Sequence, residues 1–225
     1  MQQRALYSRS NYRAEPMSDR TAIVYIIDDD ARLRMALDTL FRSTGLETQL
    51  FDSATMFLEA LPEDDGPACI VVDVRMPGVS GLDFQDRLNA AGIVIPVVMM
   101  TGFGDIPMSV RSMKAGAIDF LTKPFRDQEI LDAVSDALSR HEEKRSVAMH
   151  RAELKARFED LSPREVQVLE GVVAGRMNKQ IAGDLGLSEI TVKVHRASAM
   201  KKMGARTLAD LITMAVALGL HTGAD

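Results

Sequence analysis

Five short segments that are apolar or rich in β-forming residues, each separated from the next by a helical pattern, constrain the first half of this chain most strongly. After the first segment, Leu33, Leu37 and Phe41 recur at the spacing of one helix face. Strands that alternate with helices form parallel sheets, and strands that are apolar throughout are covered on both faces. We therefore expect residues 21–140 to form an α/β domain with a doubly wound, five-stranded parallel sheet. The strands are expected at residues 22–27, 47–51, 68–72, 95–101 and 118–121.

Polar residues stand where four of these five strands end. In such sheets, ligands bind beyond the carboxyl ends of the strands, so side chains at these ends are expected to converge on one edge. Any one of them could be a helix cap or part of a solvated turn, and this is the reading we favour for Asp30. In chain order the residues at these ends are Asp28, Asp29, Asp30, Asp73, Thr101 and Lys123.

This combination of side chains suits phosphoryl transfer to a carboxylate. Clustered carboxylates at Asp28, Asp29 and Asp73 repel one another, so a hard cation such as Mg²⁺ is their natural neutraliser. Asp73 is then the expected nucleophile, while Thr101 and Lys123 can each bind a phosphoryl oxygen. A cis peptide bond between Lys123 and Pro124 would aim the lysine inward. The cation and Lys123 together explain how an aspartate is tolerated at the end of the buried segment CIVVD.

The second half is predicted to be helical, with a local basic patch. Acidic residues outnumber basic ones 21 to 14 within residues 1–140, whereas residues 176–206 hold seven basic and two acidic residues. Two helices joined by the tripeptide GLS, the second of them basic, are typical of a helix-turn-helix within a four-helix domain. In the second of these helices the inward residues are predicted to be Val192, Ala199 and Met203, with Lys193, Val194, Arg196, Ala197 and Met200 facing a DNA major groove.

The boundaries follow from composition. Residues 1–20 are expected to be a disordered N-terminal extension, and Met17 is an alternative start. Residues 127–140 are read as the last helix of the α/β domain and 141–160 as a helical or partly helical linker. We interpret the charge run there as a solvated helix face rather than as a dimeric coiled coil, because it has few apolar heptads. Residues 161–225 form the expected DNA-binding domain.

The motifs VYIIDDD, VVDVRMPGVSGLDF, VVMMTGFGD and AGAIDFLTKPF resemble the receiver domain of two-component response regulators, closest to the FixJ-like type. The resemblance implies a flavodoxin-like fold and makes Asp73 the acceptor of a phosphoryl group from a sensor histidine kinase. It also implies Mg²⁺ or Mn²⁺ bound by Asp29, Asp73 and the backbone carbonyl of Arg75, with Asp28 in support. Thr101 and Phe120 would be the switch pair, the aromatic ring turning inward when Thr101 engages the phosphate.

The segment LSPREVQVLEGVVAGRMNKQIAGDLGLSEITVKVHRASAMKKMGA resembles the LuxR-type DNA-binding domain. This implies double-stranded promoter DNA as a partner, with Lys193 and Val194 in the groove, and RNA polymerase as a further partner. Contacts to phosphates would come from Asn178, Lys179, Thr191 and Arg196. The FixJ-like resemblance also implies a homodimer formed on phosphorylation, through a face expected at Met108, Arg111, Lys114 and Asp119.

Two other functions would explain part of the sequence. Asp28 and Asp30 imitate the nucleophile motif of haloacid-dehalogenase-like phosphatases, but that reading leaves the Lys-Pro step and the helix-turn-helix unexplained, so we expect no enzyme. A receiver that only docks on proteins would not need a basic recognition helix.

No segment has about 18 uninterrupted apolar residues, and the lone Cys69 cannot form an intrachain disulfide, so we expect a cytoplasmic protein without a membrane span. His141, His150 and His221 lack the spacing of a zinc site.

Overall fold

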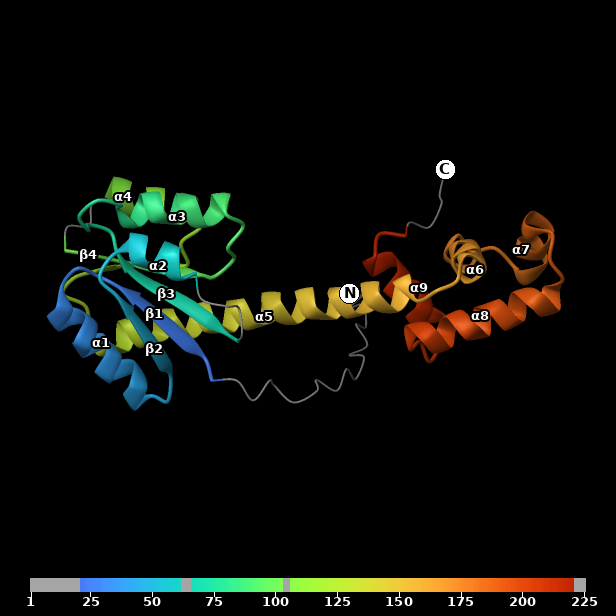
Figure 1. The fold of residues 1–225 in the computed structure, drawn as a ribbon, viewed down its shortest axis with the longest axis horizontal. Coiled ribbons are helices and arrows are strands. Elements are labelled where there is room, and N and C mark those ends of the chain that lie inside the picture. Colours follow the sequence, from blue (N-terminus) through green and yellow to red (C-terminus); the bar gives the residue numbers. More distant parts are fainter. Residues whose placement is uncertain (1–20, 62–65, 103–105, 221–225) are drawn as a thin grey trace, which may run out of the picture. The chain divides into compact units, whose positions relative to one another are not determined.

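The computed structural model describes residues 21–61, 66–102 and 106–220, with only the backbone of residues 106–109 (Figure 1). The expected N-terminal extension, residues 1–20, lies outside the described residues. By its contacts the chain divides into two compact units, residues 1–143 and 144–225, which are described separately below.

The first unit is an α/β domain around one parallel sheet. The strand order is β2-β1-β3-β4-β5, and every neighbouring pair is parallel. The predicted doubly wound, five-stranded sheet is therefore confirmed. Its strands are β1 (Ile23–Ile27), β2 (Glu47–Phe51), β3 (Ala68–Asp73), β4 (Val97–Thr101) and β5 (Asp119–Thr122), and its helices begin with α1 (Ala31–Ser43), α2 (Ala54–Ala60), α3 (Gly81–Ala90) and α4 (Ile106–Lys114).

Alternate residues of the strands supply two separate cores, one on each face of the sheet. On one face Ile70 packs in a cluster with Phe57 of α2 and Phe84 of α3. On the other, Val71 packs with Phe41 of α1 and Val134 of the following helix. Burial on both faces explains why β1, β3 and β4 are apolar almost without interruption. The polar residues that follow the strands are thereby left at the sheet's edge.

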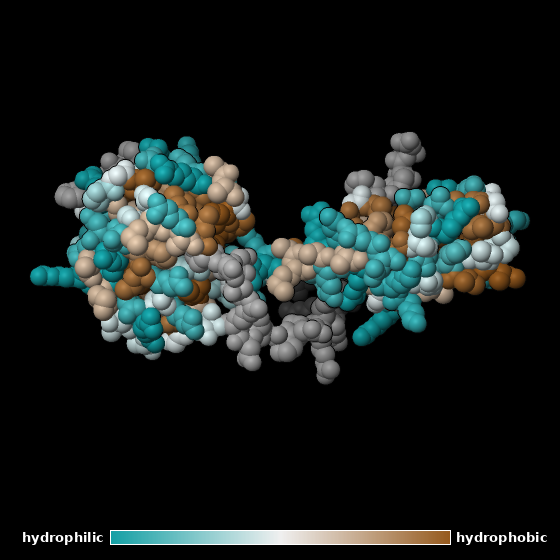
Figure 2. All heavy atoms as spheres, viewed as in Figure 1, coloured by the Kyte–Doolittle hydropathy of each residue, from teal (hydrophilic) through white to brown (hydrophobic). Residues whose placement is uncertain are grey.

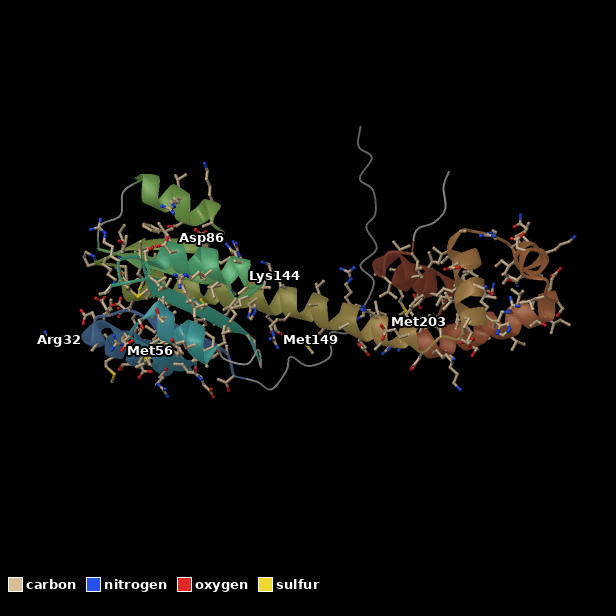
Figure 3. The ribbon with its side chains drawn as sticks, turned by 45° about the horizontal axis from the view of Figure 1, so that its top comes forward. Arg32, Met56, Asp86, Lys144, Met149 and Met203 are labelled. Atoms are coloured by element: carbon tan, nitrogen blue, oxygen red, sulfur yellow. The ribbon has the colours of Figure 1, made fainter. Side chains whose placement is uncertain are left out.

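Helix α5 (Asp127–Glu159) is one continuous helix of 33 residues. Its first turns pack on the sheet through Ile130 and Val134. At His141, which is 4% exposed, the ring Nδ1 accepts a hydrogen bond of 2.8 Å from the backbone N–H of Ala68. Between His141 and Leu154 no side chain is buried, and Met149 projects from the helix in Figure 3. The segment read as a linker from residue 141 is thus helical up to Glu159.

The second unit is helical, and its four further helices are α6 (Pro163–Val173), α7 (Asn178–Leu185), α8 (Glu189–Met203) and α9 (Leu208–Ala217). Ser162 caps α6 by accepting a hydrogen bond from the N–H of Glu165, and Pro163 follows it in the first turn. Gly171 lets α6 approach α7, because a Cβ there would lie 2.8 Å from Ile181. Met203, labelled at the end of α8 in Figure 3, is fully buried. In this unit α8 is the basic helix.

Among the described helices, none is long and apolar enough to cross a membrane. Cys69 is buried in β3, where burial raises the pKa of its thiol.

Candidate functional site

A buried ion-pair triad lies at the carboxyl edge of the sheet. Lys123 follows β5, and its Nζ lies 2.7 Å from Oδ2 of Asp28 and 2.7 Å from Oδ1 of Asp73. The side chain of Asp28 is 1% exposed and that of Asp73 is 7% exposed, while that of Lys123 is 23% exposed. Three residues that the sequence placed at separate strand ends therefore meet at one point.

The electrostatics of the triad keep the lysine charged. Burial lowers the pKa of Lys123, but the hydrogen bonds and charges of Asp28 and Asp73 outweigh it, so the pKa is raised overall. Burial also raises the pKa of Asp73, which Lys123 partly opposes. One ammonium thus compensates two carboxylates, and a net negative charge remains at the edge.

Backbone groups orient both carboxylates. The N–H of Arg75 donates to Oδ2 of Asp73 at 2.7 Å, and the N–H of Asp30 donates to Oδ1 of Asp28 at 2.8 Å. Asp30 itself caps α1 by accepting a hydrogen bond from the N–H of Arg32 at 2.8 Å. This is the capping role expected for Asp30. The second carboxylate of the phosphatase-like motif is therefore occupied in capping α1.

The turn after β3 requires glycine at two places. A Cβ on Gly81 would lie 2.6 Å from the backbone oxygen of Asp73, so only glycine allows α3 to start this close to the strand end. Gly78 has a φ of +83°, in the region that favours glycine. The Met-Pro-Gly turn therefore sets the path of the backbone around Asp73 and Arg75.

Thr101 and Phe120 lie on the neighbouring strands β4 and β5. Thr101 is fully buried at the end of β4, and its carbonyl accepts a hydrogen bond of 2.7 Å from the N–H of Lys123. Phe120 is half-buried and packs against the core on the α2–α3 face. The peptide bond between Lys123 and Pro124 is cis.

The donor set fits a hard divalent cation. Every side-chain donor offered by Asp28, Asp29 and Asp73 is a carboxylate oxygen, and two of these carboxylates share one ammonium. In the described part of the chain, however, no three His, Cys, Asp or Glu side chains lie grouped as a metal cluster. Asp29 is exposed, while the two buried carboxylates share Lys123. The carboxylates are thus suited to Mg²⁺ without being gathered around a metal position.

In α8 the division between inward and outward residues is mostly as predicted. Val192, Ala199 and Met203 are fully buried, and Lys193, Val194 and Ala197 are exposed. The prediction for Met200 was wrong, because this residue packs against the core that contains Met203. Because successive residues of a helix are about 100° apart, Met200 lies to the side of Ala199, close to the rim of the buried face.

The residues expected at phosphates lie on both helices of the motif. Lys179 is exposed near the start of α7, and Thr191 is half-buried in the first turn of α8. Arg196 is half-buried and donates to Oδ1 of Asn178 at 3.4 Å, which joins α8 to the start of α7. Each of these side chains except that of Lys179 therefore has part of its surface covered within the unit.

A charged pair holds α8 against α6. Nζ of Lys202 lies 2.7 Å from Oε2 of Glu165, and it also donates to the carbonyl of Asp160 at 3.0 Å. Hydrogen bonds from Lys202, Ser198 and Ser162 lower the pKa of Glu165 to about 2. Although its side chain is 38% exposed, Lys202 therefore has a structural role in joining α8 to α6.

Comparison with known protein families matches each unit to a family. Residues 24–135 match the family described as response regulator receiver domain, and residues 159–215 match the bacterial regulatory proteins of the LuxR family. The chain is a response regulator. The predicted resemblance is therefore confirmed, with a receiver domain and a LuxR-type DNA-binding domain in the predicted order. The family is one of transcriptional regulators rather than of enzymes.

Similar proteins and structures span nearly the whole chain. Nodulation protein W of Bradyrhizobium diazoefficiens is 53% identical over 199 residues, which are 88% of this chain and 87% of that protein. The transcriptional regulatory protein FixJ of Azorhizobium caulinodans is 47% identical over 203 residues, 90% and 95% of the two chains. The structure of response regulator StyR has a TM-score of 0.81 at 45% identity and covers 88% of this chain and 99% of its own.

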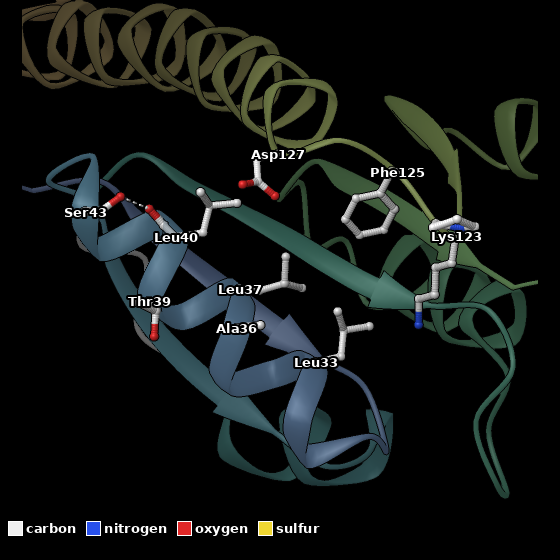
Figure 4. Close-up of a pocket in the computed structure, with 10 residues that line it drawn as sticks. Leu33, Ala36, Leu37, Thr39, Leu40, Ser43, Lys123, Phe125 and Asp127 are labelled. Atoms are coloured by element: carbon white, nitrogen blue, oxygen red, sulfur yellow. Dashed lines mark hydrogen bonds between the residues drawn. The ribbon is translucent and has the colours of Figure 1, made fainter.

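An apolar groove borders the receiver triad and was missed by the sequence analysis (Figure 4). Its volume is about 820 Å³, and Lys123 belongs to both the groove and the triad. Figure 4 shows Leu33 and Leu37 of α1 facing Phe125 across it. The leucine spacing of α1 was visible in the sequence. Whether the connection between β5 and α5 covers these leucines or leaves a groove beside them could not be predicted from that spacing. The lining residues are Leu33, Ala36, Leu37, Thr39, Leu40, Ser43, Lys123, Pro124, Phe125 and Asp127.

The face expected to pair two receivers is only partly described. Arg111 and Lys114 are exposed on α4, while the side chain of Met108 lies outside the described residues. Asp119 is half-buried, and its carboxylate accepts a hydrogen bond of 2.7 Å from the N–H of Phe120. Two apolar residues that were not predicted, Val110 and Met113, are 47% and 50% exposed on the same helix.

Proposed function

We propose that this response regulator accepts a phosphoryl group on Asp73 from a sensor histidine kinase and then controls promoters as a DNA-binding homodimer. The ion-pair triad is the observation that carries the proposal. Of its two carboxylates, Asp73 is the more exposed, at 7% against 1% for Asp28. Asp73 ends the central strand, where a donor can approach from outside the sheet.

The transfer exchanges the phosphorus–nitrogen bond of a phosphohistidine for the phosphorus–oxygen bond of an acyl phosphate. An oxygen of Asp73 forms a bond to phosphorus while the phosphorus–nitrogen bond of the kinase's phosphohistidine breaks, and the imidazole nitrogen keeps the electron pair. Lys123 would compensate charge on the phosphoryl oxygens, and Thr101, at the end of the neighbouring strand β4, would donate to one of them. Asp28, Asp29, Asp73 and the Arg75 carbonyl would hold Mg²⁺ or Mn²⁺, which would supply further charge compensation when bound.

Phosphorylation would also change the partners of Lys123. A phosphorylated Asp73 no longer offers the lysine the same carboxylate, so the ammonium of Lys123 turns to a phosphoryl oxygen. The backbone of Lys123 is bonded to Thr101, and Phe120 lies three residues before it on β5. A shift there alters the α4–β5 surface and favours the dimer. Such a population shift requires phosphate to favour the paired state by a few kcal/mol.

In the DNA-binding domain we propose that Lys193 and Val194 contact base edges. Asn178, Lys179, Thr191 and Arg196 would contact phosphates. A dimer would place one α8 in the major groove of each half of a two-fold site. RNA polymerase is proposed as a partner at the promoter, and the bacterial cytoplasm, where promoter DNA lies, as the place of action.

The test compares full-length protein with and without phosphorylation by acetyl phosphate and Mg²⁺. We expect the phosphorylated form to select two-fold sites from a randomised duplex library and to protect promoters in a genome-wide footprint. The Asp73→Asn variant, treated in the same way, should select weakly or not at all. Equal selection by all three samples would contradict a phosphorylation-controlled regulator.

A further inference from the structure

Ile190 is the most exposed of the large hydrophobic side chains in the part of the chain that the structure describes. It lies in the first turn of α8 and is 75% exposed. Val194, one turn later, is 61% exposed. The surface in Figure 2 is hydrophobic at the end of α8 that adjoins α7. These two β-branched apolar side chains gain little from burial within this unit, so we look for their contribution in contacts outside it.

The position of Ile190 on the helix excludes a part in the core. At 100° per residue, Ile190, Val194, Ala197 and Lys201 form one stripe, opposite the stripe of Val192, Ala199 and Met203. Each member of the first stripe is exposed, and each member of the second is fully buried. Ile190 therefore points directly away from the core of the unit.

The charged side chains around the exposed stripe favour a binding partner that is a polyanion and carries apolar groups in a groove. Helix α8 holds four Lys or Arg residues and a single acidic residue, Glu189. Cationic side chains beside an apolar stripe match a DNA major groove, where phosphates line the walls and thymine methyl groups project from the floor. The first turns of a recognition helix are the part that reaches base edges.

We propose that Ile190 is a specificity-determining residue, which packs with Val194 against the 5-methyl groups of thymines in each half-site. This inference rests on the DNA-binding role proposed above and adds a third base-reading position to Lys193 and Val194. The contact is apolar, so it selects A·T pairs by the presence of the methyl group rather than by a hydrogen bond.

Ile190 is not needed for folding, which makes substitution informative. Alanine has the higher helix propensity, and Ser188, not Ile190, caps the helix by accepting a hydrogen bond from Thr191 N–H at 3.1 Å. Ile190→Ala should therefore leave the melting temperature of the protein unchanged or slightly raised. The matched control is Val216→Ala, which removes an apolar side chain that is 48% exposed on α9.

The experiment uses a duplex that phosphorylated full-length protein has selected from a randomised library. Each thymine of one half-site is replaced in turn by deoxyuridine, which deletes only the methyl group. For the unmodified protein we expect affinity to fall about threefold to tenfold at one or two thymines. Ile190→Ala should lose a similar factor on the thymine duplex, and the deoxyuridine at that position should then have no further effect. Val216→Ala should behave as the unmodified protein does.

Three results would overturn the inference while leaving the regulator function intact. They are no deoxyuridine effect at any position, a full deoxyuridine penalty that persists in Ile190→Ala, and an Ile190→Ala loss that is equal on all sequences. If the unmodified protein selected no sequence, the proposed DNA-binding function would itself fail, and the inference with it.

Discussion

The ammonium of Lys123 lies 2.7 Å from Oδ1 of Asp73, 50 positions earlier in the chain. The same lysine donates its backbone N–H to Thr101. A chemical change at the carboxylate of Asp73 therefore acts, through Lys123, on the hydrogen bond that joins the ends of β4 and β5. Because Lys123 also compensates Asp28, the lysine combines a structural role with the one proposed for it in signalling.

Lys123→Met should destabilise the receiver domain by about 2–4 kcal/mol, because it leaves two buried carboxylates without their cation. Urea unfolding followed by tyrosine fluorescence, to which the buried Tyr25 contributes, would measure this, with the exposed Lys114→Met as control. Added Mg²⁺ should restore part of the loss. The variant should also accept some phosphate from acetyl phosphate without gaining affinity for DNA. A Lys123→Met protein as stable as Lys114→Met would show that the triad does not stabilise the fold.

Val110→Asp should weaken the phosphorylated dimer at least about tenfold, because the proposed α4 face would then bury an unpaired charge. Sedimentation velocity of the phosphorylated protein measures the dimer. Val94→Asp is the matched control, because Val94 is 63% exposed and precedes β4 at the opposite end of the strand. If phosphorylation did not change sedimentation of the unmodified protein, or if both variants dimerised normally, the α4 face would not be the interface.

Lys193→Ala and Lys179→Ala should have different effects on DNA binding. Loss of Lys193 should relax the preference at one or two base pairs, by about 1–3 kcal/mol. Loss of Lys179 should weaken all sequences alike and flatten the salt dependence, since a phosphate contact carries no sequence information. Binding to a randomised operator library at two salt concentrations separates these outcomes. The assigned roles would be exchanged if Lys179→Ala altered the preferred sequence.

Much of the receiver was predictable because its strands are short, apolar and followed by polar residues. Parallel strands share one carboxyl edge, so the order of Asp28, Asp73 and Lys123 along the chain already indicated that they meet. The sequence did not indicate that Lys123 contacts both carboxylates while Asp29 stays exposed. That distinction depends on side-chain direction after each strand ends, where no periodic pattern applies.

The errors in the second domain lie at the margins of helix faces. Val192 and Met203 sit at the centre of the buried stripe of α8 and were placed correctly, whereas Met200 sits at its rim. The exposed apolar residue Ile190 was also missed, as was Val110 in the receiver domain, because a hydrophobic residue in a helix is expected to face a core. Their exposure depends on how neighbouring elements pack, which the local pattern does not contain.

The stability of the DNA-binding domain should depend on pH through Glu165. Its folded pKa of about 2 lies below the usual value of a glutamate, so the stabilisation is present above about pH 4.5 and is lost as the pH falls toward 2. Glu165→Gln should therefore be less stable at pH 7, by about 1–2 kcal/mol given the partial exposure of Lys202, and nearly equal to the unmodified protein near pH 2. Urea titrations followed by the methyl NMR signals of Leu169 and Met203 would measure this, with exposed Glu170→Gln as control. A difference that did not vary with pH would contradict the ion-pair account.

The most direct test of the central claim is to map the phosphoryl group after treatment with acetyl phosphate and Mg²⁺. Reduction of the acyl phosphate with borohydride marks the modified aspartate for peptide mass spectrometry. We predict a single marked position, Asp73, and no mark in Asp73→Asn. In the phosphorylated sample that has not been reduced with borohydride, the adduct should be stable to acid and labile to base. A mark on Asp28, or full promoter activation in cells by Asp73→Asn, would contradict the account.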